Sequence, residues 1–188
     1  MKRAILVTIV VCFCVVFALG EQPEFSLSYL YQGSQPVPAN GWFGLNGGRA
    51  DVSIPVARRW SVAGEVAGLH TGSYGTIGSP LTLLTFMAGP RFRFLGRDGE
   101  KDRRFTPFAQ FLLGGAHATT GLFPTSSGLN TTASSVALSV GGGVQARLSP
   151  RVSLRLLQFD YLYTHLPNGT NSFQNNYRIG AGLAFRIR

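Results

Sequence analysis

The sequence predicts an all-β fold, an eight-stranded antiparallel up-and-down transmembrane β-barrel, and three observations lead to it. The 188 residues are 45% hydrophobic and only 13% charged, whereas an ordinary soluble domain carries about 25% charged residues. After residue 20 no apolar run is long enough for a membrane-spanning helix. Apolar residues instead recur at every second position, which is the period of a β-strand. In a membrane, such strands satisfy all their backbone polar groups only as a closed sheet.

The first twenty residues, 1–20, are expected to form a cleaved secretory signal peptide. Lys2 and Arg3 precede a long apolar run that ends in a small residue, Gly20, and this is the pattern of a signal peptide. A retained membrane anchor is the alternative interpretation, because the run approaches spanning length. Both cysteines lie in this run. Disulfides and thiolate catalysis are therefore excluded for the predicted mature barrel domain, 21–188.

The first four predicted strands place apolar side chains on one face. Residues 25–32 carry aromatic or aliphatic side chains at their odd positions, and residues 84–94 carry them at their even positions. The segments 42–56 and 60–67 alternate in the same way. Because the side chains of a strand point alternately to its two faces, each segment separates an apolar face from a face of small and polar residues.

The last four predicted strands follow the same rule with two irregularities. Residues 105–117 alternate less regularly, whereas 136–148 and 177–187 alternate clearly. Within 152–163 the apolar positions change from even to odd, which predicts a β-bulge near Leu156. Segments of this length suit membrane strands, which need about 9–11 residues.

The composition of the polar face indicates which face lies inside. A soluble barrel with an apolar ligand cavity would show the same alternation with the faces reversed. However, the predicted mature chain has a single lysine, Lys101, and its polar strand faces consist mainly of Gly, Ala, Ser, Thr, Gln and Arg. Small residues fit the narrow interior of an eight-stranded barrel, so the apolar face is expected to meet lipid. The aromatic residues expected to form two interfacial girdles are Trp42, Trp60, Phe94, Phe105, Tyr163, Tyr177 and Phe185.

Both signs of charge are expected in the barrel interior, which we call the lumen. The predicted lumen charges are Glu24, Arg49, Asp51, Glu65, Arg91, Arg93, Arg147, Arg155, Asp160, Arg178 and Arg186. Because an eight-stranded interior is narrow enough to be filled by side chains, we expect a structural network of ion pairs between these arginines and acids. A gated ion path, and with it a narrow porin-like channel, is the alternative.

The connections between the strands alternate in charge. Four contain no Asp, Glu, Lys or Arg: 32–41, 71–80, 118–133 and 166–176. The other three hold Arg58 and Arg59, a mixed cluster at 97–104, and Arg151. Bacterial barrels have short periplasmic turns and longer external loops, so the basic turns are expected in the periplasm. These turns could attract anionic headgroups or simply be solvated. Nucleic acid is not expected as a partner, because the basic residues are scattered and no stacking platform accompanies them.

Three histidines are the candidates for catalysis or metal binding. His70, His117 and His165 fall at the outer ends of predicted strands, and Ser73 follows His70 closely. Nucleophilic catalysis would also need an orienting carboxylate at the same depth, and the neutral loops have none. A zinc site would need the imidazoles to converge on one ion, although alternate strands hold them apart. We therefore expect no enzyme, no cofactor and no metal site, with an outer-membrane lipid-modifying enzyme as the alternative.

Several short motifs follow one another in order along the mature chain. They are Asn40-Gly41-Trp42, Ala57-Arg58-Arg59-Trp60, Ala88-Gly89-Pro90-Arg91-Phe92, Thr106-Pro107-Phe108, Gly141-Gly142-Gly143-Val144 and Asn175-Asn176-Tyr177-Arg178. This series resembles the outer-membrane beta-barrel domain family of Gram-negative bacteria and is similar to the eight-stranded transmembrane domain of outer-membrane protein A. The resemblance implies a monomer in the cell outer membrane, with outer-membrane lipids and the barrel assembly machinery as partners. It implies a structural or surface-interaction role and does not identify an external partner.

Overall fold

The computed structural model describes residues 22–35, 42–74, 78–94, 104–125, 128–167 and 172–187. The expected signal peptide lies outside these residues, as does nearly all of the mixed cluster at 97–104. Within the described ranges, no helix is both long enough and apolar enough to cross a membrane.

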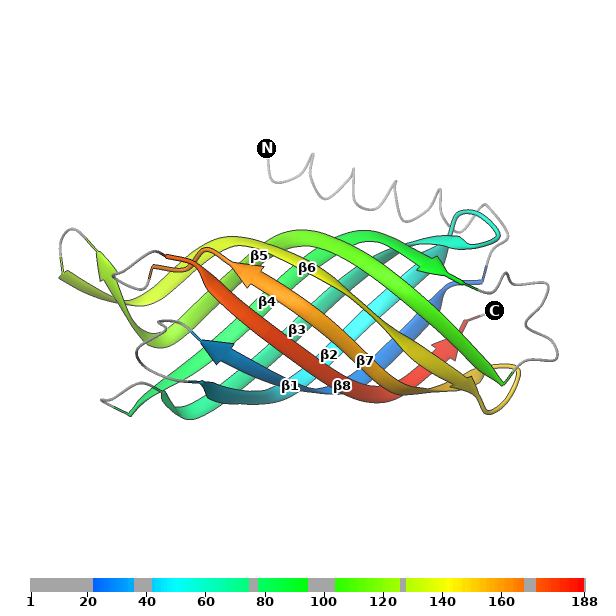
Figure 1. Cartoon of the computed structure of the whole chain (residues 1–188), viewed down its shortest axis with the longest axis horizontal. Coiled ribbons are helices and arrows are strands. Elements are labelled where there is room, and N and C mark those ends of the chain that lie inside the picture. Colours follow the sequence, from blue (N-terminus) through cyan, green and yellow to red (C-terminus); the bar gives the residue numbers. More distant parts are fainter. Residues whose placement is uncertain are drawn as a thin grey trace.

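Eight strands form one closed, antiparallel barrel (Figure 1). They are β1 (Glu24–Gln35), β2 (Phe43–Pro55), β3 (Trp60–Tyr74), β4 (Ser79–Arg93), β5 (Phe105–Thr125), β6 (Gly128–Arg147), β7 (Val152–Thr164) and β8 (Gln174–Arg186). Each strand pairs with its neighbours in the sequence, and β1 also pairs with β8 from Glu24↔Arg186 to Gln35↔Asn175. This last pairing closes the wall of the barrel. The predicted eight-stranded up-and-down barrel is therefore confirmed.

Burial alternates along the strands as the sequence pattern predicts. In β1 the even positions from Glu24 to Ser34 are buried. The odd positions Leu27, Tyr29 and Tyr31 are 52%, 59% and 42% exposed. Large apolar side chains so exposed would be costly in water. The outer surface is therefore suited to lipid.

The bulge expected near Leu156 is confirmed in β7. Val144 of β6 pairs with Leu157. The next residue of β6, Gln145, pairs with Arg155, so Leu156 is the extra residue. Both leucines are exposed on the outer surface, while Arg155 is fully buried. The bulge thus changes the phase of the strand and keeps apolar residues outward on both sides of it.

Aromatic side chains gather on the outer surface near both ends of the barrel. The ring of Trp60 lies 4.9 Å from that of Phe92, and the ring of Trp42 lies 5.5 Å from that of Tyr177. The aromatic residues of the expected girdles that are more than one third exposed are Trp42, Trp60, Phe94, Phe105, Tyr177 and Phe185. This arrangement matches the interfacial belts of membrane barrels.

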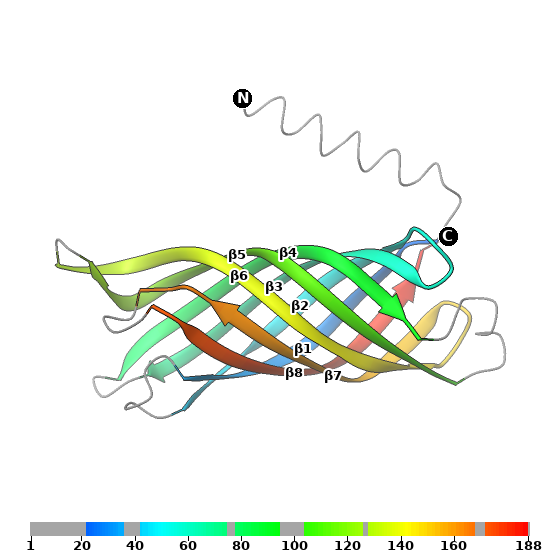
Figure 2. The ribbon, with the colours of Figure 1, turned by 45° about the horizontal axis from the view of Figure 1, so that its top comes forward.

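The prediction of a loop at 118–133 is wrong, because most of this segment belongs to strands β5 and β6. β5 and β6 continue beyond the ends of β4 and β7, the strands that flank them, as a paired hairpin (Figure 2). Pairing with β4 stops at Thr119, and pairing with β7 begins only at Ala137. We call residues 120–136 the extended hairpin. The segment is rich in threonine, whose β-branched side chain favours strands, and the absence of charge does not by itself make a loop.

The two ends of the barrel differ in charge. One end, which we call the basic end, holds the turns 56–59 and 148–151, and the chain terminus labelled C lies at this end (Figure 1). Arg58, Arg59 and Arg151 are exposed there. The opposite end, which we call the neutral end, carries the extended hairpin (Figure 2).

Candidate functional site

The expected lumen charges line the inner wall of the barrel. Eight of them are at most 3% exposed: Glu24, Arg49, Asp51, Glu65, Arg91, Arg155, Asp160 and Arg178. Four of these are acids and four are arginines, so their formal charges cancel. The side chains of Arg93 and Arg186 are 13% and 16% exposed, and Arg147 is half-buried. Buried charges are costly unless they are paired, so their contacts decide what the lumen can do.

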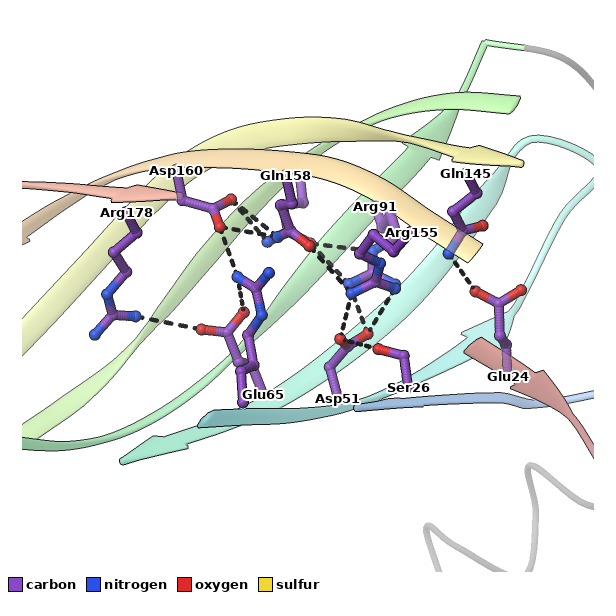
Figure 3. A network of polar contacts seen from close by, with 12 residues as sticks. Glu24, Ser26, Asp51, Glu65, Arg91, Gln145, Arg155, Gln158, Asp160 and Arg178 are labelled. Atoms are coloured by element: carbon purple, nitrogen blue, oxygen red, sulfur yellow. Dashed lines mark hydrogen bonds and ion pairs between the residues drawn. The ribbon is translucent and has the colours of Figure 1, made fainter. Parts of the chain in front are cut away.

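Asp51 of β2 is the centre of one ion-pair cluster (Figure 3). Its carboxylate oxygens lie 2.5 Å from Nη1 of Arg155 and 2.9 Å from Nη2 of Arg91. The hydroxyl of Ser26 donates a further hydrogen bond to the same carboxylate. One acid from β2 therefore holds guanidinium groups from β4 and β7, two strands that do not pair with β2.

The ring of Phe108 packs against both arginines of this cluster. The guanidinium carbon of Arg91 lies 5.0 Å from the ring centroid, and that of Arg155 lies 5.3 Å from it. Phe108 is 4% exposed. An aromatic face attracts a cation within about 6 Å, so the ring stabilises the two positive charges and excludes water from them.

Glu65 and Asp160 form a second cluster closer to the neutral end (Figure 3). Nη1 of Arg49 lies 2.7 Å from Asp160 and 3.5 Å from Glu65. Nη1 of Arg178 lies 3.4 Å from Glu65. Arg178 also donates to Gln32 and Thr85 at 2.8 and 3.2 Å. These contacts join β2 to β7 and β3 to β8 across the lumen.

Two glutamines connect the two clusters. Gln110 accepts hydrogen bonds from Arg91 and donates one to Asp160 at 3.1 Å. Gln158 accepts from Arg155 at 3.0 Å and donates to Asp160. Both amides are buried. Sequence reasoning did not include them in the network, although both lie on inward-facing positions where an uncharged amide can act as donor and acceptor at once.

A third group of contacts surrounds Glu24 at the basic end. Its carboxylate lies 3.1 Å from Nη2 of Arg93 and 3.8 Å from Nε of Arg186. The side chain of Gln145 donates to it at 2.9 Å. Glu24 pairs with residues of β4, β6 and β8, and so connects the start of β1 to three other strands.

The part of the lumen nearer the neutral end contains a cluster of buried leucines beside uncharged polar side chains such as Gln32 and Asn176. Its five most buried leucines are at most 2% exposed: Leu30, Leu45, Leu69, Leu112 and Leu162. They belong to one buried cluster with Leu83 and Met87. We call this cluster the leucine plug. Sequence reasoning missed it, because these leucines stand on strand faces that are otherwise small or polar.

The histidines lie on the outer side of the barrel wall. Nδ1 of His70 is 3.0 Å from the hydroxyl of Thr82, and Nδ1 of His117 is 2.8 Å from that of Ser134. His165 packs edge-on against Phe173 at 4.9 Å. All three imidazoles are exposed, whereas the nearest acids are buried inside the lumen. In the part of the chain that the structure describes, no three residues of the types His, Cys, Asp and Glu are grouped so as to hold a metal ion.

The sequence matches a known protein family over nearly its whole length. The Outer membrane protein beta-barrel domain family matches residues 17–185. No curated protein matches the sequence significantly.

Solved structures similar to this chain are small outer-membrane barrels. Neisserial surface protein A covers 88% of this chain and is itself 97% covered, with a TM-score of 0.68 and 14% identity. Ail, the attachment invasion locus protein of Yersinia pestis, covers 88% of this chain and is 99% covered, with a TM-score of 0.57 and 17% identity. The structure of Ail in complex with the heparin analogue sucrose octasulfate gives a TM-score of 0.54 at 18% identity, with 88% of this chain and 99% of Ail covered. At these identities the likeness concerns the fold alone.

Proposed function

The chain belongs to the outer membrane protein beta-barrel domain family, and from this premise we propose that it is a closed barrel with a structural or surface-interaction role. In this proposal the lumen is filled by side chains and conducts neither ions nor solutes. The protein catalyses no reaction. Its neutral end faces outward and its basic end faces the periplasm, as the short turns at the basic end favour.

The two layers of the lumen carry this proposal. Ions that entered at the basic end would meet the clusters around Asp51 and Asp160, whose side chains are 1% and 2% exposed. Beyond them they would meet the leucine plug, where no charged side chain could replace the hydration shell of an ion. An eight-stranded barrel is just wide enough for side chains to fill it. A filled lumen with an apolar layer is therefore a barrier rather than a pore.

Conductance in planar bilayers tests this part of the proposal. The purified, refolded protein should give no discrete current steps at voltages where a porin reconstituted in parallel gives them. The variant Leu30→Ala/Leu112→Ala, which thins the plug, is a second arm and should also remain closed, because the charged clusters stay in place. Discrete steps from the unaltered protein would refute the closed lumen and favour the porin-like alternative.

The extended hairpin supports a surface-interaction role. It projects beyond the strands that flank it (Figure 2), and Leu129 near its tip is 65% exposed. The hairpin carries no Asp, Glu, Lys or Arg. A partner that engages it would therefore be held by apolar and hydrogen-bonding contacts, and its binding should depend little on salt.

Cells that display the protein provide the assay for this role. Retention of cells on coated surfaces and cell-to-cell aggregation should fall when residues 118–133 are replaced by a two-residue turn. The same assays on the intact protein should change little between low and high salt. Heat-modifiable gel migration must be unchanged in the shortened variant, because this shows that the barrel still folds. Equal retention of cells with and without the hairpin would refute the role of this segment.

The positions of the histidines favour the absence of catalysis. The three imidazoles stand outside the barrel wall and the carboxylates of Glu65 and Asp160 stand inside it. A triad needs its acid within hydrogen-bonding reach of the imidazole. Replacement of each histidine by alanine should therefore leave the lipopolysaccharide and phospholipid composition of the outer membrane unchanged, as measured by mass spectrometry. A lipid product that disappears in one of these variants would establish the enzyme alternative.

A further inference from the structure

Arginines recur in pairs around the basic end of the barrel. In three places the last arginine of a strand donates its backbone N–H to the carbonyl of an arginine in a neighbouring turn. The pairs are Arg93 to Arg59 at 2.8 Å, Arg147 to Arg104 at 2.8 Å, and Arg186 to Arg151 at 2.9 Å. The turn arginines come directly before β3, β5 and β7. The pairs therefore repeat at every second strand around the rim.

The two members of each pair differ in their surroundings. The strand-end arginines point toward the lumen, where Arg93 and Arg186 contact Glu24. The turn arginines Arg59, Arg104 and Arg151 are exposed. A backbone hydrogen bond from the adjacent strand end holds each turn arginine. The Cα position of each of these arginines at the rim is therefore fixed.

Exposed aromatic residues follow two of the three turn arginines directly along the chain. Trp60 comes after Arg59 and is 49% exposed, and Phe105 comes after Arg104 and is 55% exposed. Tryptophan and phenylalanine at such positions mark the boundary between the hydrocarbon layer and the headgroups. The arginine that precedes each of them is therefore placed at the depth of the lipid phosphates.

We propose that Arg59, Arg104 and Arg151 bind the phosphate groups of anionic phospholipids at the basic end of the barrel. Guanidinium groups pair with phosphate oxygens through two parallel hydrogen bonds, which an ammonium group does not do. Each arginine near an anionic surface is worth about a fivefold preference for that surface. The three arginines together give the basic end a preference for anionic phospholipids that the neutral end lacks.

The charges elsewhere in the chain strengthen this asymmetry. The segment 97–103, between β4 and β5, contains three basic and three acidic residues in sequence, so it does not offset the turn arginines. The four connections at the neutral end contain no Asp, Glu, Lys or Arg. Anionic lipid should therefore gather around one end of the barrel only, and this would hold the barrel at a fixed depth and direction in an asymmetric membrane.

The two tryptophans of the chain allow a direct test, because one lies at each end. Trp60 is next to Arg59 at the basic end, and Trp42 lies at the neutral end beside Tyr177. The protein is refolded into phosphatidylcholine vesicles that contain a small fraction of brominated phosphatidylglycerol or, in parallel, the same fraction of brominated phosphatidylcholine. Bromine quenches tryptophan fluorescence only at short range. The variants Trp42→Phe and Trp60→Phe leave one reporter each.

We expect brominated phosphatidylglycerol to quench Trp60 at a several-fold lower lipid fraction than brominated phosphatidylcholine does. Trp42 should be quenched equally by both lipids. The triple variant R59Q/R104Q/R151Q should lose the preference at Trp60, whereas R59K/R104K/R151K should keep part of it. The heat-modifiable gel shift must be retained in both. Equal quenching of Trp60 by the two lipids, or a preference that survives in the glutamine variant, would refute the proposal whichever way the barrel is oriented and whether or not its lumen is closed.

Discussion

Removal of Asp51 should destabilise the barrel more than a substitution at an exposed position of the extended hairpin. The carboxylate of Asp51 is 1% exposed and accepts hydrogen bonds from Arg155, Arg91 and Ser26. In Asp51→Ala both guanidinium groups lose the one acid that forms an ion pair with them among the described residues. The buried charges that remain would then be three acids and four arginines, because one of the four acids is gone.

The magnitude follows from what the two arginines retain. Arg91 keeps its hydrogen bonds to Gln110 at 2.8 and 3.0 Å, and Arg155 keeps one to Gln158 at 3.0 Å. Amide oxygens satisfy donors but do not neutralise charge. Removing one partner of a buried ion pair costs about 3–5 kcal/mol. We expect a loss toward the lower end of that range, because these amides and the ring of Phe108 remain.

Urea-induced unfolding of the refolded protein in vesicles or detergent measures this loss through tryptophan fluorescence. Asn130→Ala, an exposed change on the extended hairpin, is the control and should stay within about 0.5 kcal/mol of the unaltered protein. The double variant Asp51→Ala/Arg155→Ala should lose less than the sum of the single variants, since one unpaired charge is removed again. An unfolding midpoint for Asp51→Ala equal to that of the control would refute the assignment of these contacts as a stabilising network.

Three further outcomes are expected. Gly114→Ala should lower the refolded fraction on a heat-modifiable gel, because a Cβ at Gly114 would lie 1.9 Å from the carbonyl oxygen of Phe86. Gly64→Ala is the control and should refold normally, because a Cβ at Gly64 meets nothing within 4 Å. Leu112→Ala should lower the free energy of unfolding by about 2–5 kcal/mol in the same urea titration, as for other buried leucines; a loss below about 1 kcal/mol would mean that the plug is loosely packed. Sucrose octasulfate should give no binding heat in calorimetry at physiological salt with the variant R58Q/R59Q/R104Q/R151Q, which lacks the exposed arginines of the basic end, since the neutral end has no Lys or Arg to meet its sulfates. Saturable binding to this variant would contradict the expected neutrality of that end.

Local alternation was enough to predict the wall of the barrel. Each strand has one face toward lipid and one toward the lumen, so the period of two, the number of strands and even the bulge at Leu156 can be read from the order of apolar residues. The eleven lumen charges could be named for the same reason. Their partners could not, because Arg49 and Asp160 are separated by 111 positions and meet only once the stagger of the closed barrel is fixed.

Two features of the structure could not be predicted from the local sequence pattern. The sequence of the extended hairpin predicts a loop, because its residues are mostly small, polar and uncharged. In the structure, pairing between β5 and β6 makes most of 118–133 strand. The leucine plug was missed because Leu30 stands between Ser28 and Gln32 on a face that is otherwise polar. Whether such a leucine is an exception or part of a layer depends on which residues of the other seven strands lie at the same depth, and that is a property of the tilt of the strands.

The two layers of the lumen strengthen each other. The attraction between opposite charges is stronger in a medium that water does not enter. The leucine plug provides such a medium, because it closes the lumen on the side of the neutral end. The plug alone would give little specificity, since apolar side chains can pack in many registers. The ion pairs supply it, because Asp51 to Arg155, Arg49 to Asp160 and Arg178 to Glu65 each connect strands that are not neighbours. A shift of one strand by two residues would keep its apolar face toward lipid but would move its charges away from their partners, so the network fixes the register that the apolar face alone leaves open.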